Sequence, residues 1–169
     1  PPLCYGTTTT LSVIASAGFG SYTYQWNTGA TTSSIVIGAG IYCATVTDSA
    51  GCIINTCATV SQDSLLTVTI SAPPLICVGA NALITASPGG GQPPYTYLWN
   101  TGQTTSSITQ PAGTYSITVT DANTGSCTTT ANVSYSEEPP MNASMASEKV
   151  SCFGGNDGSA TLTASGGIS

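Results

Sequence analysis

The side chains best able to do chemistry in this sequence are its seven cysteines, because the chain has no histidine and a single basic residue, Lys149. Cysteine thiols act as nucleophiles, bind metal ions or form disulfides, and their spacing separates these uses. No two cysteines stand in a Cys-x-x-Cys pair, and a zinc site normally recruits a histidine or a second close thiolate pair. We therefore expect disulfides made in an oxidising compartment, and neither a metal site nor a cofactor.

Charge and composition exclude several classes of function. Seven acidic residues against one basic residue give a net charge of -6, which is unsuited to binding nucleic acid or an anionic membrane surface. The groups used in proton transfer are nearly absent, so we expect no enzymatic activity. No apolar run approaches the roughly 18 residues of a membrane helix, so membrane insertion is not expected. No secretion signal opens the chain at Pro1, which indicates a mature product or an excised fragment.

The chain repeats itself at a shift of 73 positions. The segment Tyr22 to Gly29 matches Tyr95 to Gly102 with one mismatch, and the same shift superposes Cys4 on Cys77. A third copy begins near Cys152. A period of about 70 to 75 residues indicates an array of small domains. We place the first unit at 1–62, the second at 63–138 and the first strands of a third, incomplete unit at 139–169.

Within each unit the hydrophobic pattern has period two, which is the pattern of β-strands. Aromatic residues alternate with polar ones in Tyr22 to Trp26, and the run from Tyr42 to Thr47 alternates in the same way. Glycine, asparagine and aspartate separate the runs, as in turns. Several strands without helices between them favour tandem antiparallel β-sandwiches of the immunoglobulin type, an all-β fold.

The units differ at their beginnings. The run Leu65 to Ile70 precedes Cys77 as a first strand, and Met141, Ala143 and Met145 alternate before Cys152 as its counterpart. The first unit has no such run before Cys4. An open sandwich exposes an edge that natural β-proteins pair or cover. We expect the missing strand to come from upstream residues of a longer chain or from a neighbouring molecule in a fibre.

Three segments carry a resemblance to a known family. They are Pro93 to Gly102, Ala112 to Asp121 and Cys152 to Ala160. Together they resemble the SprB-type repeats of Bacteroidota cell-surface adhesins, which are similar to PKD-like immunoglobulin folds. The resemblance implies an extracellular location at the cell surface, type IX secretion and a link to gliding motility.

Corresponding positions in the two units predict the disulfide pairs. Cys4 and Cys52 occupy the places that Cys77 and Cys127 occupy in the second unit. We therefore expect the pairs Cys4–Cys52 and Cys77–Cys127, each within one unit. Two further cysteines, Cys43 and Cys57, lie equidistant from the centre of a hairpin near Ala50 and should face each other across two neighbouring strands. Cys152 is left without a partner.

The repeated aromatic residues have two interpretations. Trp26 and Trp99 could form platforms for sugar rings with their neighbouring tyrosines, or they could fill the cores of the sandwiches, as the corresponding tryptophan does in immunoglobulin folds. We favour the core because burial explains the alternation. Tyr42 and Tyr115 each follow a glycine into a strand and resemble the corner tyrosine that hydrogen-bonds the backbone in such sandwiches.

Asp48 and Asp121 recur at the same hairpin turn, where aspartate usually accepts hydrogen bonds from its own backbone. Calcium between the units is an alternative, for which the linkers offer Asp63 in one case and Glu137 with Glu138 in the other. Ser49 and Ser64 each follow an aspartate and precede an aliphatic residue, a pattern that resembles the O-glycosylation acceptor of Bacteroidota.

The sequence thus favours a structural and adhesive part of a secreted bacterial surface or filament protein. The expected partners are other copies in a fibre or further repeats in the same chain, with surface glycans as possible targets. The alternative is a carbohydrate-binding accessory module of a secreted polysaccharide-degrading enzyme.

Overall fold

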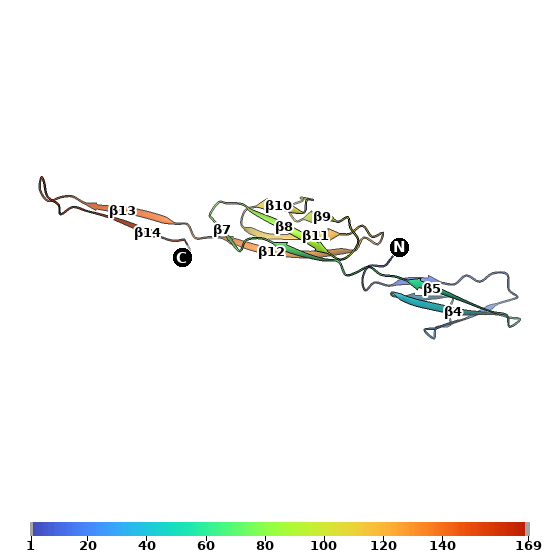
Figure 1. Cartoon of the computed structure of the whole chain (residues 1–169). Coiled ribbons are helices and arrows are strands. Elements are labelled where there is room, and N and C mark those ends of the chain that lie inside the picture. Colours follow the sequence, from blue (N-terminus) through green and yellow to red (C-terminus); the bar gives the residue numbers. More distant parts are fainter. Residues whose placement is uncertain (1, 168–169) are drawn as a thin grey trace.

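Three groups of β-strands follow one another along an elongated molecule, of which the computed structural model describes residues 2–167 (Figure 1). The first group contains β1–β5, the second contains β6–β12, and the third is the hairpin β13–β14. The described residues are all-β, and none of them forms a helix with the length and apolar character needed to cross a membrane.

Repeat 2, the second group, is a two-layered sandwich. One sheet has the order β10-β8-β6 and the other the order β7-β12-β11-β9. All pairs are antiparallel except β7 with β12, which is parallel. The strands are β6 (Thr67–Ser71), β7 (Leu75–Ile76), β8 (Ala82–Gly89), β9 (Thr96–Trp99), β10 (Ser107–Gln110), β11 (Gly113–Thr120) and β12 (Thr128–Glu137).

The core of repeat 2 follows from the alternation in its strands. Three alternate residues are buried in each of the strands β8 and β11, and the largest fully buried side chains are those of Trp99, Ile84, Ile117 and Val119. The indole Nε1 of Trp99 donates to the carbonyl oxygen of Thr105 at 2.9 Å, so its polar atom keeps a partner inside the sandwich.

Repeat 1, the first group, has the same plan with fewer strands. Its sheets have the orders β1-β3 and β2-β4-β5. Trp26 is 3% exposed, and its indole Nε1 donates to the carbonyl oxygen of Thr32 at 2.8 Å, which repeats the arrangement of Trp99. The strands are β1 (Thr9–Ser12), β2 (Tyr22–Trp26), β3 (Ser34–Ile37), β4 (Gly40–Asp48) and β5 (Ile53–Val60).

The asparagine and glycine after each tryptophan shape the turn that follows. The side chain of Asn27 accepts a hydrogen bond from the backbone of Cys43 at 3.2 Å and donates to the carbonyl of Ile41 at 3.1 Å, which ties the end of β2 to β4. Gly29 has a φ of +88°, a conformation that glycine adopts without steric cost. The matching turn in repeat 2 uses Asn100 and Gly102.

Within residues 2–62, no strand takes the place of β6. The first strand, β1, pairs only with β3, so its other edge is open. In repeat 2, Leu66 is buried just before β6, whereas repeat 1 has at the matching place a groove of about 480 Å³. The groove contains Val13, Ile14 and Ile54 among its lining residues, and Ile14 is 92% exposed. Repeat 1 therefore presents an apolar opening between its sheets.

The hairpin formed by β13 (Asn142–Glu148) and β14 (Ser159–Ser165) extends away from repeat 2, and every residue in its strands is exposed (Figure 1). One face is apolar, since Ala143 lies opposite Ala164 and Met145 lies opposite Leu162. The pairing of β13 with β14 resembles that of β6 with β8 in repeat 2.

Replacing either tryptophan by alanine should destabilise its own repeat. We expect Trp99→Ala to lower the free energy of unfolding of repeat 2 by about 3–5 kcal/mol, because it empties a core position and leaves the Thr105 carbonyl without its donor. Urea unfolding followed by circular dichroism measures the loss, and the fluorescence of the remaining Trp26 reports repeat 1 separately. Leu98→Ala, a truncation at an exposed position of the same strand, is the control. A Trp99→Ala variant as stable as Leu98→Ala would contradict the core assignment.

Candidate functional site

The two sandwiches meet at a junction built by segments far apart in the sequence. The leading arm, residues 2–7, runs parallel to the chain just after β5. Leu3 donates to the carbonyl of Ser61 and accepts from the backbone of Asp63, both at 2.9 Å. The side chain of Gln62 accepts a hydrogen bond from Gly6 at 3.2 Å. This pairing places Cys4 at the end of repeat 1 that adjoins repeat 2.

Repeat 2 contributes the turn between β11 and β12, which Asp121 organises. One carboxylate oxygen of Asp121 accepts hydrogen bonds from the backbone of Asn123 at 3.1 Å and of Cys127 at 3.2 Å. The other oxygen accepts from the backbone of Gln92 at 3.0 Å. Asp121 is 6% exposed, so the carboxylate is enclosed by the loops that it fixes, and these loops hold Cys127 toward repeat 1.

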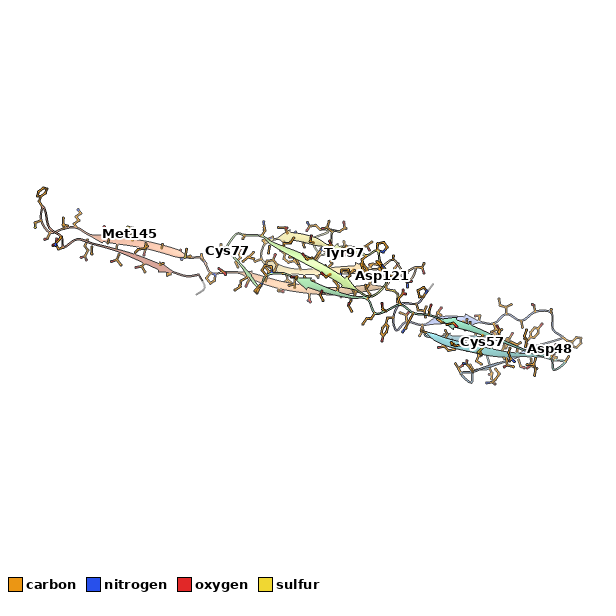
Figure 2. The ribbon with its side chains drawn as sticks, viewed as in Figure 1. Asp48, Cys57, Cys77, Tyr97, Asp121 and Met145 are labelled. Carbon is orange, nitrogen blue, oxygen red and sulfur yellow. A yellow bond between two sulfur atoms is a disulfide. The ribbon has the colours of Figure 1, made fainter. Side chains whose placement is uncertain are left out.

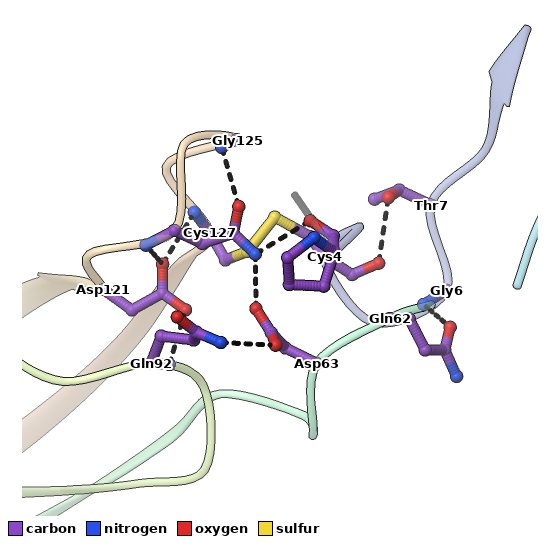
Figure 3. The surroundings of a disulfide bond; sticks show 11 residues. Cys4, Gly6, Thr7, Gln62, Asp63, Gln92, Asp121, Gly125 and Cys127 are labelled. Carbon is purple, nitrogen blue, oxygen red and sulfur yellow. Dashed lines mark hydrogen bonds between the residues drawn. A yellow bond between two sulfur atoms is a disulfide. The ribbon is translucent and has the colours of Figure 1, made fainter. Parts of the chain in front are cut away.

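A disulfide between Cys4 and Cys127 crosses the junction (Figure 3). The two residues are 123 positions apart in the sequence, and their Cα atoms are 5.5 Å apart. Closing so long a loop lowers the conformational entropy of the unfolded chain, which stabilises the folded protein by about 4–5 kcal/mol in the chain-entropy treatment. The bond therefore joins the two repeats covalently at a second point, besides the linker.

A polar network surrounds the disulfide (Figure 3). The side-chain amide of Asn123 donates to the carbonyl of Pro2 at 3.0 Å and to the carboxylate of Asp63. The Asp63 carboxylate also accepts from the side chain of Gln92 at 3.1 Å. Asn123 is 6% exposed. Hydrogen bonds thus hold three segments together, namely the arm, the linker and the turn. The two bonds to the Asp63 carboxylate involve a charged acceptor, and such bonds are stronger than those between neutral groups.

The expected pairs Cys4–Cys52 and Cys77–Cys127 are wrong. In each repeat the arm pairs with the end of the last strand, whereas the turn cysteine precedes the start of that strand. Strand β5 has 8 residues and β12 has 10, which separate the two cysteines of one repeat by about 26–33 Å. A disulfide requires Cα atoms within roughly 7 Å. The pairing that forms is between neighbouring repeats.

The remaining cysteines divide into one bonded pair and three thiols. Cys43 and Cys57 lie directly opposite each other on β4 and β5 and form a disulfide, as the hairpin spacing predicts. Repeat 2 has Ser116 opposite Asn132 at the matching positions. Cys52, Cys77 and Cys152 are free and exposed.

The aromatic residues lie in or against the cores. Trp26 and Trp99 are buried, so neither ring offers a face on which a sugar could stack. The hydroxyl of Tyr115 donates to the carbonyl of Pro111 at 2.8 Å, which is the backbone contact expected of a corner tyrosine. Tyr42 packs half-buried against the core of repeat 1, and among the described residues its hydroxyl makes no such bond.

Asp48 repeats the arrangement of Asp121 at the far end of repeat 1 (Figure 2). Its carboxylate accepts hydrogen bonds at 2.9 Å from the backbones of Phe19, Cys52 and Ala50. These bonds, that from Phe19 foremost, lower the pKa of Asp48 below its ordinary value of 3.8. Both aspartates are therefore turn-forming groups.

The linker carboxylates are also engaged with the protein itself. Asp63 belongs to the junction network, and Glu137 accepts a hydrogen bond from the backbone of Gly79 at 3.0 Å. Among the residues that the structure describes, no three acidic or cysteine side chains gather in the manner of a metal site. The two serines of the O-glycosylation pattern, Ser49 and Ser64, are exposed, and their modification stays a prediction.

Comparison with known proteins gives one family match. The model of the SprB repeat matches residues 1–31, 67–104 and 146–168, which together make up more than half of the chain. Among curated proteins, none has a sequence that matches.

Two solved structures share a low level of similarity. The three N-terminal domains of the highly immunogenic outer capsid protein Hoc of bacteriophage RB49 match 99% of this chain and 67% of their own, with 16% identity and a TM-score of 0.47. The N-terminal eight immunoglobulin domains of the Down syndrome cell adhesion molecule match 85% of this chain and 23% of their own, with 15% identity and a TM-score of 0.38.

Removing the bond across the junction should loosen the two repeats from each other. We expect Cys4→Ser to lower the stability of the linked repeats by about 2–5 kcal/mol and to speed cleavage by chymotrypsin at the exposed Leu65. Limited proteolysis followed by mass spectrometry measures the rate. Cys152→Ser, which removes a free thiol outside the junction, is the control. Equal cleavage of the two variants would show that the disulfide does not hold the junction.

Acidification should weaken repeat 1 through Asp48. A lowered pKa in the folded state means that Asp48 contributes stability above its ordinary pKa, and that this contribution is lost as the pH falls through the folded value. The melting temperature of repeat 1 should therefore fall between pH 5 and pH 2, and Asp48→Asn should flatten this dependence. Asp157→Asn removes a carboxylate whose pKa is also lowered, but outside repeat 1, and should leave the profile of repeat 1 unchanged. An identical fall in Asp48→Asn would refute this account.

Proposed function

Because the chain belongs to the SprB repeat family, we propose that it forms a structural and adhesive stretch of tandem sandwiches in a bacterial cell-surface protein, with no catalytic role. In this function the repeats extend the protein from the cell and present an adhesive region. The protein would be of Bacteroidota origin, exported by type IX secretion and connected with gliding motility, as the first resemblance implied.

The observation that carries the proposal is the junction between the repeats. Flexible linkers alone would let sandwiches turn freely. Here the linker, the Cys4–Cys127 bond and the contacts of Asn123 act together, and they keep the repeats in line along the long axis (Figure 1). An aligned array suits a protein that must reach outward from a surface.

The two disulfides support an extracellular location. Disulfides form and persist outside the cytoplasm, in the periplasm or on the cell surface. The Cys43–Cys57 and Cys4–Cys127 bonds are both structural, since one crosslinks two strands and the other links two repeats. A reducing cytoplasm would leave both bonds open and the junction without its covalent link.

Other repeats are the partners best suited to the array. The open edge of β1 and the groove beside Ile14 and Ile54 offer a place for a missing strand. Strand β13 pairs with β14 as β6 pairs with β8, so β13 is the counterpart of β6 in the third group. A strand from preceding residues of a longer chain or from a neighbouring copy in a fibre would complete repeat 1. Surface glycans are candidate targets of the adhesive region. A role as a carbohydrate-binding accessory module has no supporting observation, because both tryptophans are buried.

The test is to locate the protein on cells of its source. Antibodies raised against residues 1–169 should label intact, unpermeabilised cells, and immunogold electron microscopy should place the label outside the envelope. An antibody against a cytoplasmic enzyme of the same cells is the control for intactness. Deleting the gene should reduce attachment of the cells to a surface. Labelling that requires permeabilisation would rule out the proposed surface function.

A further inference from the structure

The Cys4–Cys127 bond joins two kinds of half-site, and each kind occurs again in the chain. We call the first the arm site, which consists of a cysteine just after the segment that pairs with the last strand of its own repeat. We call the second the turn site, which consists of a cysteine that closes the turn before that last strand. Cys4 belongs to an arm site, and Cys127 belongs to a turn site.

Cys77 lies in an arm site with the geometry of Cys4. Ile76, like Leu3, pairs in parallel with the end of the last strand of its repeat. Three backbone hydrogen bonds recur at the two sites. At Cys4 they run from Gly6 to Gln62 Oε1 (3.2 Å), from Thr7 to the Cys4 carbonyl (3.1 Å) and from Asp63 to the Leu3 carbonyl (2.9 Å). At Cys77 they run from Gly79 to Glu137 Oε1 (3.0 Å), from Ala80 to the Cys77 carbonyl (3.0 Å) and from Glu138 to the Ile76 carbonyl (2.7 Å). Glu138 thereby takes the place of Asp63, the carboxylate of the junction network.

Cys52 lies in a turn site with the geometry of Cys127. An aspartate accepts from the backbone of the cysteine in each case, and the aspartate backbone donates to the cysteine carbonyl. Three backbone hydrogen bonds to the aspartate recur at the two sites. Asp48 accepts from Cys52 and Ala50 at Oδ1 and from Phe19 at Oδ2, each at 2.9 Å. Asp121 accepts from Cys127 (3.2 Å) and Asn123 (3.1 Å) at Oδ1 and from Gln92 (3.0 Å) at Oδ2.

The half-sites lie at the ends where neighbouring repeats attach. Figure 2 shows Cys77 at the end of repeat 2 next to the hairpin, Asp121 at the opposite end of repeat 2, and Asp48 at the tip of repeat 1 farthest from the junction. Both thiols, Cys77 and Cys52, are exposed. Each repeat therefore has an arm site at one end and a turn site at the other.

We propose that the bond between repeats is periodic, so that the arm cysteine of each repeat bonds to the turn cysteine of the repeat that follows it. Cys77 then takes a turn cysteine from the repeat whose first strands are β13 and β14, and Cys52 takes an arm cysteine from a preceding repeat. The partner of each thiol is another sandwich of this kind. Residues 139–167 contain no counterparts of β11 and β12, which are the strands that carry a turn site.

The same rule assigns Cys152 to an arm site. Its carbonyl accepts a hydrogen bond from the backbone of Gly155 at 3.0 Å, at the spacing of Cys4 to Thr7 and of Cys77 to Ala80. One rule thus accounts for all three free thiols, since each is a half-site whose complement lies on a neighbouring repeat. This inference rests on the proposed tandem array and adds the covalent chemistry by which its members are joined.

Bond formation needs an oxidant. Two thiols lose two electrons and two protons as the S–S bond forms, and a thiol–disulfide oxidoreductase of the export compartment accepts them as its own disulfide is reduced to a dithiol. The exchange proceeds through a mixed disulfide on one exposed thiol, which the second thiolate then attacks. Exposure of Cys52 and Cys77 permits this route.

The test is peptide mapping without reductant of the protein isolated from its source, with free thiols blocked at lysis. We expect the Cys77 peptide bonded to a turn-type peptide, with an aspartate four to six residues before its cysteine, and the Cys52 peptide bonded to an arm-type peptide. The Cys43–Cys57 peptide in the same digest is the internal control. Recovery of Cys52 or Cys77 as a blocked thiol, or bonded to a half-site of its own kind, would overturn the proposal.

A variant separates the chemistry from the folding. Cys77→Ser should leave the Cys4–Cys127 and Cys43–Cys57 bonds intact and should expose one new thiol, on the turn-type peptide found in the unmodified protein. In the unmodified protein, a drop in molecular mass upon reduction would identify the partner of Cys77 as a second copy, and the absence of such a drop would identify it as a later repeat of the same chain. No new thiol in this variant would refute the pairing. The proposed surface function is tested separately by antibody labelling of intact cells. A peptide map that contradicts the periodic disulfide would therefore not refute the proposed function.

Discussion

The parallel pairing between the leading arm and the end of the last strand determines how the repeats are joined. It carries each arm cysteine the full length of the sandwich away from the turn cysteine of the same repeat, which excludes a bond within one repeat. The same pairing brings the arm of repeat 1 against the turn of repeat 2, where Asp121 holds Cys127 in place. Alignment, covalent linkage and the polar network at Asp63 all follow from this one contact.

Local patterns were sufficient to predict much of the fold. The two-residue period placed Trp26 and Trp99 in the cores, and the symmetry of a hairpin placed Cys43 opposite Cys57. Such patterns concern a single strand or hairpin, in which the separation of two residues along the sequence determines their distance in the structure. The junction depends instead on which end of a sandwich each segment reaches. The end that each segment reaches is set by the topology of the strands and cannot be read from positions that match between repeats. Matching positions therefore suggested the pairs Cys4–Cys52 and Cys77–Cys127, which the lengths of β5 and β12 exclude.

A comparison of the two repeats shows what β6 contributes, because no strand within residues 2–62 takes its place. Repeat 2 buries Leu66 and Ile84, while the position of Ile84 is held in repeat 1 by Leu11, which is only half-buried. The smaller core of repeat 1 coincides with the additional Cys43–Cys57 crosslink between β4 and β5. A crosslink restricts the unfolded chain without requiring any further buried area. This is a common way to stabilise small extracellular domains whose cores are limited.

The Cys4–Cys127 bond also sets the route by which mechanical tension would pass through the molecule. A pull applied at residue 2 and at residue 138 would run from Cys4 through the sulfur atoms to Cys127 and then along β12. Residues 5–126, which include nearly all of both cores, would lie outside the loaded path. A strong pull could therefore detach β12 from its neighbours without drawing out the chain of repeat 1. The Cys4–Cys127 disulfide would thereby limit the extension of the protein under load.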